Sequence, residues 1–217
     1  MPPLRRSCSN QPFRKLVDIF TPSAQKIPLP DGDLVFFPQL FSLPEADDFL
    51  AALIAEIPWR QERITLYGKE HALPRLTAWH GDPGKNYTYS GLRLRVAPWT
   101  PTLLAIREKI TAASGAAFNS VLLNYYRHGA DSVAWHSDDE PELGKTPIIG
   151  SVSFGAARVF QMKHKYQPHL RHSLHLLHGS LLIMQGETQT YWLHQLPKRR
   201  DLLHPRINLT FRNGQPG

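Results

Sequence analysis

The sequence predicts a mainly β protein with flanking helices, in which an antiparallel barrel or jelly roll forms the core. In the first half of the chain, two stretches have the apolar spacing of helices. Beyond residue 118 the chain breaks into short strand-like runs bounded by Gly, Pro or polar residues. These runs are 121–126, 148–154, 157–162, 180–184 and 206–212. Short strands at regular spacing are typical of barrels and sandwiches.

One domain is expected, because 217 residues suffice to bury a core without disulfides. Residues 1–30 are rich in Pro, Ser, Arg and Lys without periodicity, so we predict a basic tail or loosely attached arm there. Residues 31–217 then form the domain. Inside it, residues 60–98 mix basic and aromatic side chains with Gly, which predicts hairpins and exposed loops, and residues 118–213 contain the β core.

Two helices are located by their capping residues. Ser42 and Glu45 have the spacing of a capping box, and Pro58 ends the apolar run that follows them. The second helix is expected to take Thr100 as its N-cap, with a proline in the first turn, and to stop before Gly115. Both helices precede the strand-rich part of the chain.

The net charge of +7, from 25 Lys and Arg against 18 Asp and Glu, suits a polyanionic partner such as DNA or RNA but does not by itself select one, since many basic proteins bind no nucleic acid. The one cysteine, Cys8, cannot form an internal disulfide. No apolar run approaches the roughly 18 residues that span a bilayer, and the N-terminus lacks the apolar segment of a signal peptide. We therefore expect an intracellular, reducing compartment and no membrane contact.

His136 and Asp138 form an H-x-D pair, whose side chains share a face in extended backbone. His194, 56 residues beyond Asp138, offers a second imidazole. Two histidines and one carboxylate leave coordination positions open, which suits non-heme Fe(II) with O₂ and a chelating co-substrate. The H-x-D pair alone is more typical of a surface histidine beside acidic residues, and zinc accepts the same ligands. Its interpretation therefore depends on the residues that accompany it.

A polar stripe follows the last predicted strand. Arg206, Asn208, Thr210 and Arg212 alternate with apolar residues and so lie on one face. Burying such a stripe is costly without an anionic partner, and a dicarboxylate such as 2-oxoglutarate would satisfy the two guanidinium groups. The alternative is an exposed face of the final strand, which would show the same alternation.

Together these motifs resemble the AlkB family of Fe(II)- and 2-oxoglutarate-dependent nucleic-acid dealkylases. The resemblance runs from about residue 60 to residue 213. The matching segments, in family order, are 124–126, 136–140, 151–155, 178–182, His194 and 206–212. Segments 81–82 and 87–91 are similar to the branch of the family that repairs duplex DNA in animals.

The resemblance implies a double-stranded β-helix (jelly-roll) core under a nucleotide-recognition lid from the N-terminal half, at residues 60–98. It also implies Fe(II) on the histidine–aspartate triad, with 2-oxoglutarate and O₂ as co-substrates. Asn124 and Tyr126 would form hydrogen bonds with 2-oxoglutarate. Arg206 would pair with its distal carboxylate, while Thr210 and Arg212 complete the pocket.

The same resemblance implies residues that bind the substrate base. Tyr67, Gly68 and Lys69 match a finger that fills the gap left by a flipped base. Tyr87 and Tyr89 match aromatic residues that line the base pocket. Asp139, with Glu140 beside it, would accept a hydrogen bond from the exocyclic amine of the base. Arg75 and the basic segments 163–165 and 198–200 correspond to positions that face phosphates.

The function that the resemblance implies is repair of alkylated DNA. N-alkylated bases such as 1-methyladenine and 3-methylcytosine would be oxidatively demethylated, with release of formaldehyde and succinate. An aromatic pocket fits a base taken out of the stack, and a cationic base gains from aromatic faces. The same chemistry on RNA, tRNA or protein remains an alternative, as does a non-catalytic nucleic-acid-binding barrel. We expect a monomer, cytoplasmic if bacterial and nuclear if eukaryotic.

Overall fold

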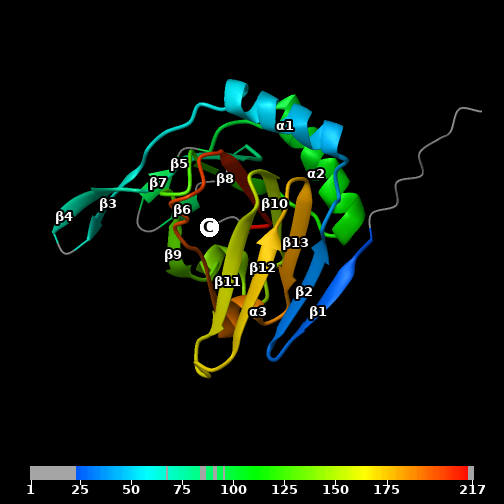
Figure 1. Cartoon of the computed structure of the whole chain (residues 1–217), viewed down its shortest axis with the longest axis vertical. Coiled ribbons are helices and arrows are strands. Elements are labelled where there is room, and N and C mark those ends of the chain that lie inside the picture. The colour runs from blue at the N-terminus through cyan, green and yellow to red at the C-terminus, as the bar shows by residue number, and fades with distance from the viewer. Residues whose placement is uncertain (1–22, 67, 84–86, 90–91, 95, 215–217) are drawn as a thin grey trace, which may run out of the picture.

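Two antiparallel sheets face each other across a shared core (Figure 1). The computed structural model describes residues 23–66, 68–83, 87–89, 92–94 and 96–214. The larger sheet consists, in spatial order, of β1 (Gln25–Leu29), β2 (Gly32–Phe37), β13 (Ser180–Gln185), β10 (Ile149–Gly155), β15 (Arg206–Arg212), β8 (Ser120–Tyr126) and β5 (Leu76–Gly81). The smaller sheet consists of β12 (Arg171–Leu176), β11 (Arg158–His164), β14 (Trp192–Leu196) and β9 (Val133–His136).

All five strand-like runs predicted beyond residue 118 are confirmed as β8, β10, β11, β13 and β15. The two-sheet arrangement agrees with the predicted jelly roll. The inner core between the sheets contains apolar side chains from both. These side chains include Trp79, Leu122, Phe160, Met162 and Met184.

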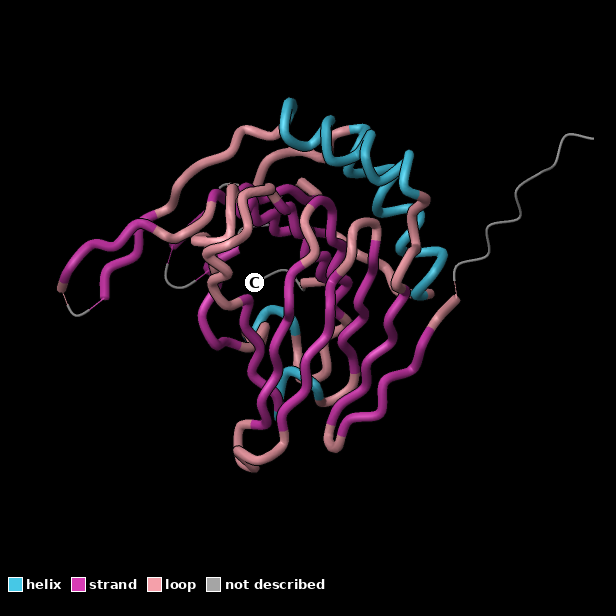
Figure 2. The backbone as a smooth tube through the Cα atoms, viewed as in Figure 1, coloured by secondary structure: helices cyan, strands magenta, loops and turns pink. Residues whose placement is uncertain are grey.

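Two helices cover the outer face of the larger sheet, as Figure 2 shows. They are α1 (Leu43–Glu56) and α2 (Pro101–Ser114). The capping box of Ser42 and Glu45 is present, Thr100 caps α2, and Gly115 ends it in a left-handed conformation, so the predicted helix boundaries are confirmed. The other helices are short: the 3-10 turn Pro141–Leu143 and α3 (Thr188–Tyr191). Within the described residues, no helix combines the length and hydrophobicity required to cross a bilayer.

Strand β15 lies inside the larger sheet between β10 and β8, and both of its faces are buried. Ile207, Leu209 and Phe211 point outward and pack under the helices, all with no exposed surface. The alternate residues of the strand therefore point inward, between the two sheets. The helices thus fix the position of the strand that carries the polar stripe.

Two hairpins extend from the body of the protein. Strands β3 (Arg63–Leu66) and β4 (Lys69–Ala72) form one hairpin, which projects to the left in Figure 1, and β6 (Tyr87–Tyr89) and β7 (Leu92–Leu94) form the other. Hairpins were predicted for residues 60–98, and they are present. However, β5 lies in the same segment and belongs to the larger sheet, so the predicted lid includes one strand of the core.

The boundary of the predicted N-terminal arm also needs correction. Residues 25–29 form β1, which pairs with β2 at the edge of the larger sheet. An edge strand tolerates polar residues and a proline such as Pro28, so composition alone did not distinguish it from a tail. Residues 1–22 of the predicted arm lie outside the described residues.

Replacing Leu209 by alanine should lower the free energy of unfolding by about 2–5 kcal/mol, because it leaves a cavity between β15 and the helices. Denaturant unfolding followed by circular dichroism measures this change. The matched control is Leu203→Ala, since Leu203 is 80% exposed and its loss should change the unfolding free energy by about 0.5 kcal/mol or less. Equal losses in the two variants would contradict the packing of β15 under the helices.

Candidate active site

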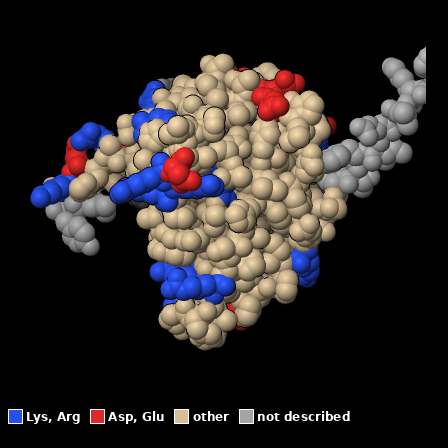
Figure 3. All heavy atoms as spheres, in the orientation of Figure 1, with Lys and Arg blue, Asp and Glu red and all other residues tan. Residues whose placement is uncertain are grey.

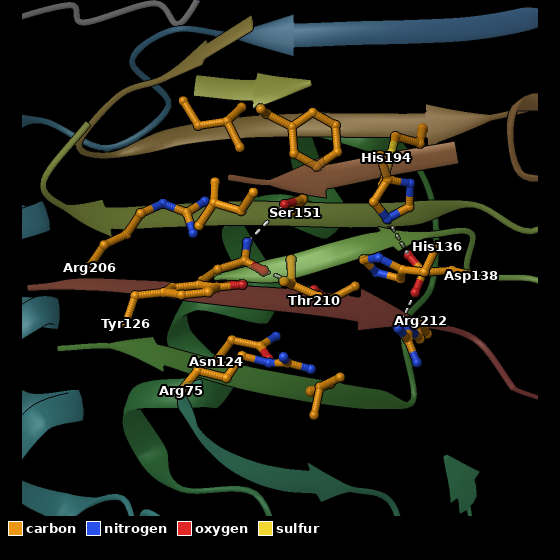
Figure 4. A pocket seen from close by; sticks show the side chains of 17 residues that line it. Arg75, Asn124, Tyr126, His136, Asp138, Ser151, His194, Arg206, Thr210 and Arg212 are labelled. Carbon is orange, nitrogen blue, oxygen red and sulfur yellow. Dashed lines mark hydrogen bonds and ion pairs between the residues drawn. The ribbon is translucent and has the colours of Figure 1, made fainter. Parts of the chain in front are cut away.

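A cavity opens between the two sheets, on the inner face of β15 (Figure 4). Its walls combine the polar stripe with the predicted metal ligands and a few apolar side chains. The polar residues around it are Arg75, Asn124, Tyr126, His136, Asp138, Ser151, His194, Arg206, Asn208, Thr210 and Arg212. The predicted metal and co-substrate residues, far apart in the sequence, therefore line one cavity.

The three predicted metal ligands meet at one end of this cavity. His136 ends β9, Asp138 follows two residues later, and His194 lies on β14 opposite His136 in the strand register. One ligand atom from each residue lies within 4.8 Å of the others. Asp138 and His194 are almost fully buried, so their donor atoms are protected from bulk water.

Hydrogen bonds fix the orientation of two of these ligands. His136 donates from Nδ1 to the carbonyl oxygen of Ala134 over 2.8 Å, which leaves Nε2 for a metal. The backbone amide of Asp138 donates to Oε1 of the buried Gln189 over 2.9 Å. Arg212 pairs with Oδ1 of Asp138, while Oδ2 lies 3.7 Å from His194 Nε2. The free oxygen and the free imidazole nitrogen thus face the same point.

The charge states of the buried ligands suit metal binding. Burial alone would raise the pKa of Asp138, but the guanidinium of Arg212 and the two neighbouring imidazoles outweigh it and keep the pKa below its usual value. Burial, followed by repulsion from His136, lowers the pKa of His194 to about 3. The site therefore offers a carboxylate and a neutral imidazole at neutral pH, which are the forms that coordinate a metal.

These donors fit a divalent metal with open coordination positions. Two imidazoles and one carboxylate on one side of an ion are the ligand set of non-heme Fe(II) oxygenases. Zinc accepts the same ligand types, so the triad does not by itself choose the metal. The other end of the cavity provides the second criterion.

The polar stripe of β15 is buried, which is the arrangement for which the sequence predicts an anionic partner. Arg206 and Arg212 are each 2% exposed, and Asn208 and Thr210 are each 8% exposed. The stripe is held by β10: Arg206 donates to Ser153 Oγ over 2.9 Å, and Asn208 donates to Ser151 Oγ over 2.8 Å. The alternative of an exposed strand face is therefore wrong.

Arg206 has no carboxylate partner among the described residues, and its Nε has no hydrogen-bond partner there. Burial lowers the pKa of Arg206 to about 10, so the guanidinium still carries its charge at neutral pH. It lies 5.3 Å from the centre of the Tyr126 ring at the end of the cavity opposite the triad (Figure 4). A buried, unbalanced cation calls for an anion. A dicarboxylate spanning the cavity would neutralise the charge of Arg206.

The acidic residues that follow the triad have different environments. Asp139 is exposed, accepts a hydrogen bond from Ser137 over 2.8 Å and pairs with Lys165 over 3.3 Å. Glu140 is partly buried, with Oε1 lying 3.5 Å from Nη1 of Arg212, and burial raises its pKa. Asp139 is therefore accessible to a substrate, whereas Glu140 lies against the arginine that supports the metal ligand.

The predicted lid residues are only partly described. Gly68 turns the β3–β4 hairpin with a φ of 73°, and Lys69 beside it is exposed. Tyr67 lies outside the described residues, and so do the side chains of Tyr87 and Tyr89, whose backbone forms β6. The position of the hairpin tip is thus known, while the aromatic contacts stay predictions.

Arg75 does not lie where the resemblance placed it. Its side chain was expected to face phosphate, but the residue is 4% exposed and lines the cavity. It donates from Nε to Asn124 Oδ1 over 2.7 Å and from Nη1 to the carbonyl of Ser132 over 3.4 Å. The prediction is wrong because Arg75 directly precedes β5, a strand of the larger sheet, rather than lying on an exposed lid.

Of the two other basic segments, 198–200 is at the surface, with Lys198, Arg199 and Arg200 all exposed. Segment 163–165 is less accessible than predicted, because His164 is buried and Lys163 is half-buried with its ammonium 4.5 Å from the ring centre of Trp135. Lys and Arg side chains gather beside the β3–β4 hairpin and at the lower end of the face drawn in Figure 3. This distribution is compatible with a polyanion on the side of the hairpin.

Sequence reasoning assigned no role to three residues that support the site. Ser151 and Ser153 hold the polar stripe, and Gln189 on α3 holds the backbone of Asp138. The serines had a signal, since they alternate with apolar residues in a strand-like run. Gln189 had no such signal in the sequence, because its contact with Asp138 depends on how α3 packs against the segment that follows β9.

Comparison with known proteins connects this geometry to a family. The profile described as 2OG-Fe(II) oxygenase superfamily matches residues 23–212. The chain is 44% identical over 188 residues to alpha-ketoglutarate-dependent dioxygenase alkB homolog 3 of Bos taurus, covering 82% of this chain and 65% of that protein. It is 44% identical over 183 residues to DNA oxidative demethylase ALKBH2 of Homo sapiens, covering 80% and 70%. The chain is therefore equally similar in sequence to these two relatives.

The solved structure of OsALKBH1 has the same fold, with a TM-score of 0.59 and 16% identity, covering 87% of this chain and all of that one. The chain spans 65% of the length of the Bos taurus relative, slightly less than two thirds. DNA oxidative demethylase ALKBH2 of Arabidopsis thaliana is 36% identical over 232 residues, covering 95% of this chain and 71% of that protein.

Asp138→Asn should weaken Mn(II) binding by more than about 100-fold, because loss of an outer-shell partner alone costs 10- to 100-fold and Asp138 offers a ligand atom. Calorimetric titration of the metal-free protein with Mn(II) measures the affinity. The matched control is Asp139→Asn, since Asp139 is exposed and lies outside the triad. The triad is disproved as the metal site if the two variants bind Mn(II) equally well.

Proposed function

The chain belongs to the AlkB family of the 2OG-Fe(II) oxygenase superfamily, and on this basis we propose that it oxidatively demethylates N-alkylated bases in DNA, such as 1-methyladenine and 3-methylcytosine. The products would be the unmodified base, formaldehyde, succinate and CO₂, so the cellular role would be repair of alkylated DNA. The name of the ALKBH2 relatives supports DNA as the target. One observation carries the proposal: the metal triad lines the same cavity as a buried arginine that has no carboxylate partner among the described residues.

The cavity provides separate places for the metal and the co-substrate. His136, Asp138 and His194 would hold Fe(II), and Arg206 would bind the distal carboxylate of 2-oxoglutarate. When bound, Fe(II) with 2-oxoglutarate and O₂ supplies the oxidant that hydroxylates the alkyl group. The guanidinium of Arg206 is already positioned by Ser153, so little order must be gained when the carboxylate binds.

The remaining polar residues of the cavity would orient the co-substrate. Asn124 and Tyr126 lie on β8, where Asn208 of β15 is opposite Asn124 and Arg206 is opposite Tyr126. Thr210 lies on the same face of β15, two residues beyond Asn208. Arg212 would complete the pocket beside the metal while keeping Asp138 ionised. Each of these side chains comes from a central strand of the larger sheet, which holds a site more rigidly than loops do.

Apolar side chains around the triad would limit the access of water to the oxidant. Phe160 places its ring centre 5.2 Å from that of His194, and Leu122, Leu176 and Met184 also line the cavity. A dry pocket protects a reactive intermediate from side reactions. The alkyl group would enter this pocket from the side of the exposed Asp139.

Recognition of the base would depend on the edge of the site and the lid. Asp139 would accept a hydrogen bond from the exocyclic amine, and Tyr87 and Tyr89 would stack on the flipped base. Residues 67–69, which follow β3 in the sequence, would fill the gap left in the duplex. Basic side chains near this hairpin support contact with the phosphate backbone (Figure 3).

Strand preference and cellular setting belong to the proposal as well. We expect duplex DNA to be a substrate, on the likeness of residues 81–82 and 87–91 to the duplex-repairing branch. The protein would act as a monomer inside the cell, in the cytoplasm of a bacterium or the nucleus of a eukaryote. Single-stranded DNA and RNA are the competing substrates, so a test needs all three.

The reaction can be measured by incubating the Fe(II)-loaded protein with 2-oxoglutarate, O₂ and oligonucleotides that contain 1-methyladenine or 3-methylcytosine. Formaldehyde and succinate should appear in equal amounts, with repaired bases detected by mass spectrometry. His136→Ala should abolish turnover, because it removes a ligand. His175→Ala is the matched control, since His175 is exposed on the edge strand β12. Folded wild-type protein giving no product above a metal-free blank on any nucleic acid would reject the proposal.

Tyr67→Ala should reduce turnover of duplex substrates more than that of single-stranded ones. The reason is that a wedge in the duplex is needed only where a base must be extracted from a stack. Measuring kcat/KM for the same lesion in both contexts gives the comparison, and the single strand serves as the internal control. The role of Tyr67 as a wedge is ruled out if the two substrates lose turnover equally.

A further inference from the structure

We propose that Arg75 is a positioning residue for 2-oxoglutarate, which fixes the amide of Asn124 so that its NH₂ group faces the co-substrate. This inference rests on the proposed function, since it concerns the same cavity. Arg75 is buried beside Asn124 in the wall of the cavity, as Figure 4 shows. It is thus a cation of the site that neither the metal triad nor the carboxylate clamp of β15 uses.

The contact between the two side chains is short and well supported. Arg75 donates from Nε to Asn124 Oδ1 over 2.7 Å, and its Nη1 reaches the carbonyl oxygen of Ser132 over 3.4 Å. Strand pairing sets the geometry, because Thr77 on β5 lies opposite Asn124 on β8. The guanidinium is therefore held between β8 and the segment that leads into β9.

The chemistry of the two groups decides which way the amide points. An asparagine amide has an acceptor oxygen and a donor nitrogen of nearly the same shape, so it can turn over. A guanidinium has donors only, and a turned amide would set N–H groups against N–H groups in a buried place. Arg75 thus holds Oδ1 of Asn124 toward itself and directs Nδ2 away.

The NH₂ group of Asn124 is available for a ligand. Among the described residues, no acceptor receives a hydrogen bond from Asn124 Nδ2. The residue is buried, with an exposed fraction of 6%. Because Asn124 lines the cavity, a molecule bound there is the acceptor within reach. The oxygen atoms of 2-oxoglutarate are all acceptors, so the locked orientation is the one that this ligand needs.

Arg75 also adds charge to the cavity wall. Like Arg206, Arg75 has no carboxylate partner among the described residues. A buried guanidinium attracts an anion over several ångströms where water is excluded. Both the fixed amide and the added charge therefore favour a dianionic ligand over a neutral one.

The test measures the binding of 2-oxoglutarate to the Mn(II)-loaded full-length protein by calorimetry, with no nucleic acid present. Arg75→Met should raise the Kd of 2-oxoglutarate by about tenfold, the equivalent of one well-oriented hydrogen bond. Arg75→Lys, which keeps a donor, should recover part of this loss. The Kd of Mn(II), measured first in each variant, should stay within about twofold, since Arg75 does not touch the triad.

Arg60→Met is the matched control. Arg60 is exposed and pairs through its backbone with Thr77, the neighbour of the site on β5, so the variant removes a nearby cation without touching Asn124. It should leave the Kd of 2-oxoglutarate unchanged within about twofold. A loss as large as that of Arg75→Met would show that net charge, and not the fixed amide, controls binding.

A double-variant cycle separates positioning from a direct contact. If Arg75 acts mainly through Asn124, the variant with both Arg75→Met and Asn124→Ala should bind 2-oxoglutarate about as weakly as Asn124→Ala alone. Fully additive losses would overturn the proposal. So would an unchanged Kd of 2-oxoglutarate in Arg75→Met together with weaker binding of methylated DNA, measured by fluorescence anisotropy, because Arg75 would then serve the nucleic acid.

If Arg75→Met does not fold, as judged by its thermal transition, the same cycle is run with Arg75→Lys, whose loss should likewise vanish in the Asn124→Ala background. If the wild-type protein binds no 2-oxoglutarate, the proposed function fails. If the wild type binds it and the Arg75 variants bind it equally well, only the role of Arg75 fails.

Discussion

Burial of two guanidinium groups on the inner face of β15 is the constraint on which the cavity depends. Arg206 and Arg212 are each 2% exposed in the middle of the larger sheet, where an unbalanced charge is costly. Arg212 is balanced by Asp138 and partly by Glu140. Among the described residues, Arg206 contacts the hydroxyl of Ser153 and the side chain of Tyr126 but no carboxylate. The same strand thus carries one arginine that is paired with carboxylates and one that has no carboxylate partner among the described residues.

This arrangement links the metal and the co-substrate through one rigid element. Arg212 keeps Asp138 ionised and occupies one of its oxygens, so the other is directed at His194. Six residues earlier on β15, Arg206 marks the far end of the cavity. Because Ile207, Leu209 and Phe211 pack under the helices, the strand cannot shift to relieve the charge. The apolar face of β15 therefore stabilises the geometry that its polar face needs.

The sequence was sufficient for the features that depend on local periodicity. Alternation along 206–212 predicted both faces of β15, and capping residues placed α1 and α2. Local periodicity was not sufficient to predict the metal triad, because the pairing of β14 with β9 is what brings His194 opposite His136. No local pattern encodes that pairing, and the motifs shared with a known family supplied it. Composition gave one wrong boundary, because Gln25, Lys26 and Pro28 were assigned to the predicted tail although they belong to an edge strand.

Arg75 shows why family likeness does not replace geometry. Its place in a basic, aromatic segment favoured a phosphate contact, but the strand that follows it joins the core and carries Arg75 into the cavity. The most direct measurement is a crystal structure with Mn(II) and 2-oxoglutarate, with the metal located by anomalous scattering. The metal should lie between His136, Asp138 and His194, with the distal carboxylate on Arg206. A metal elsewhere, or a ligand that leaves Arg206 without an anion, would contradict the assignment of this cavity.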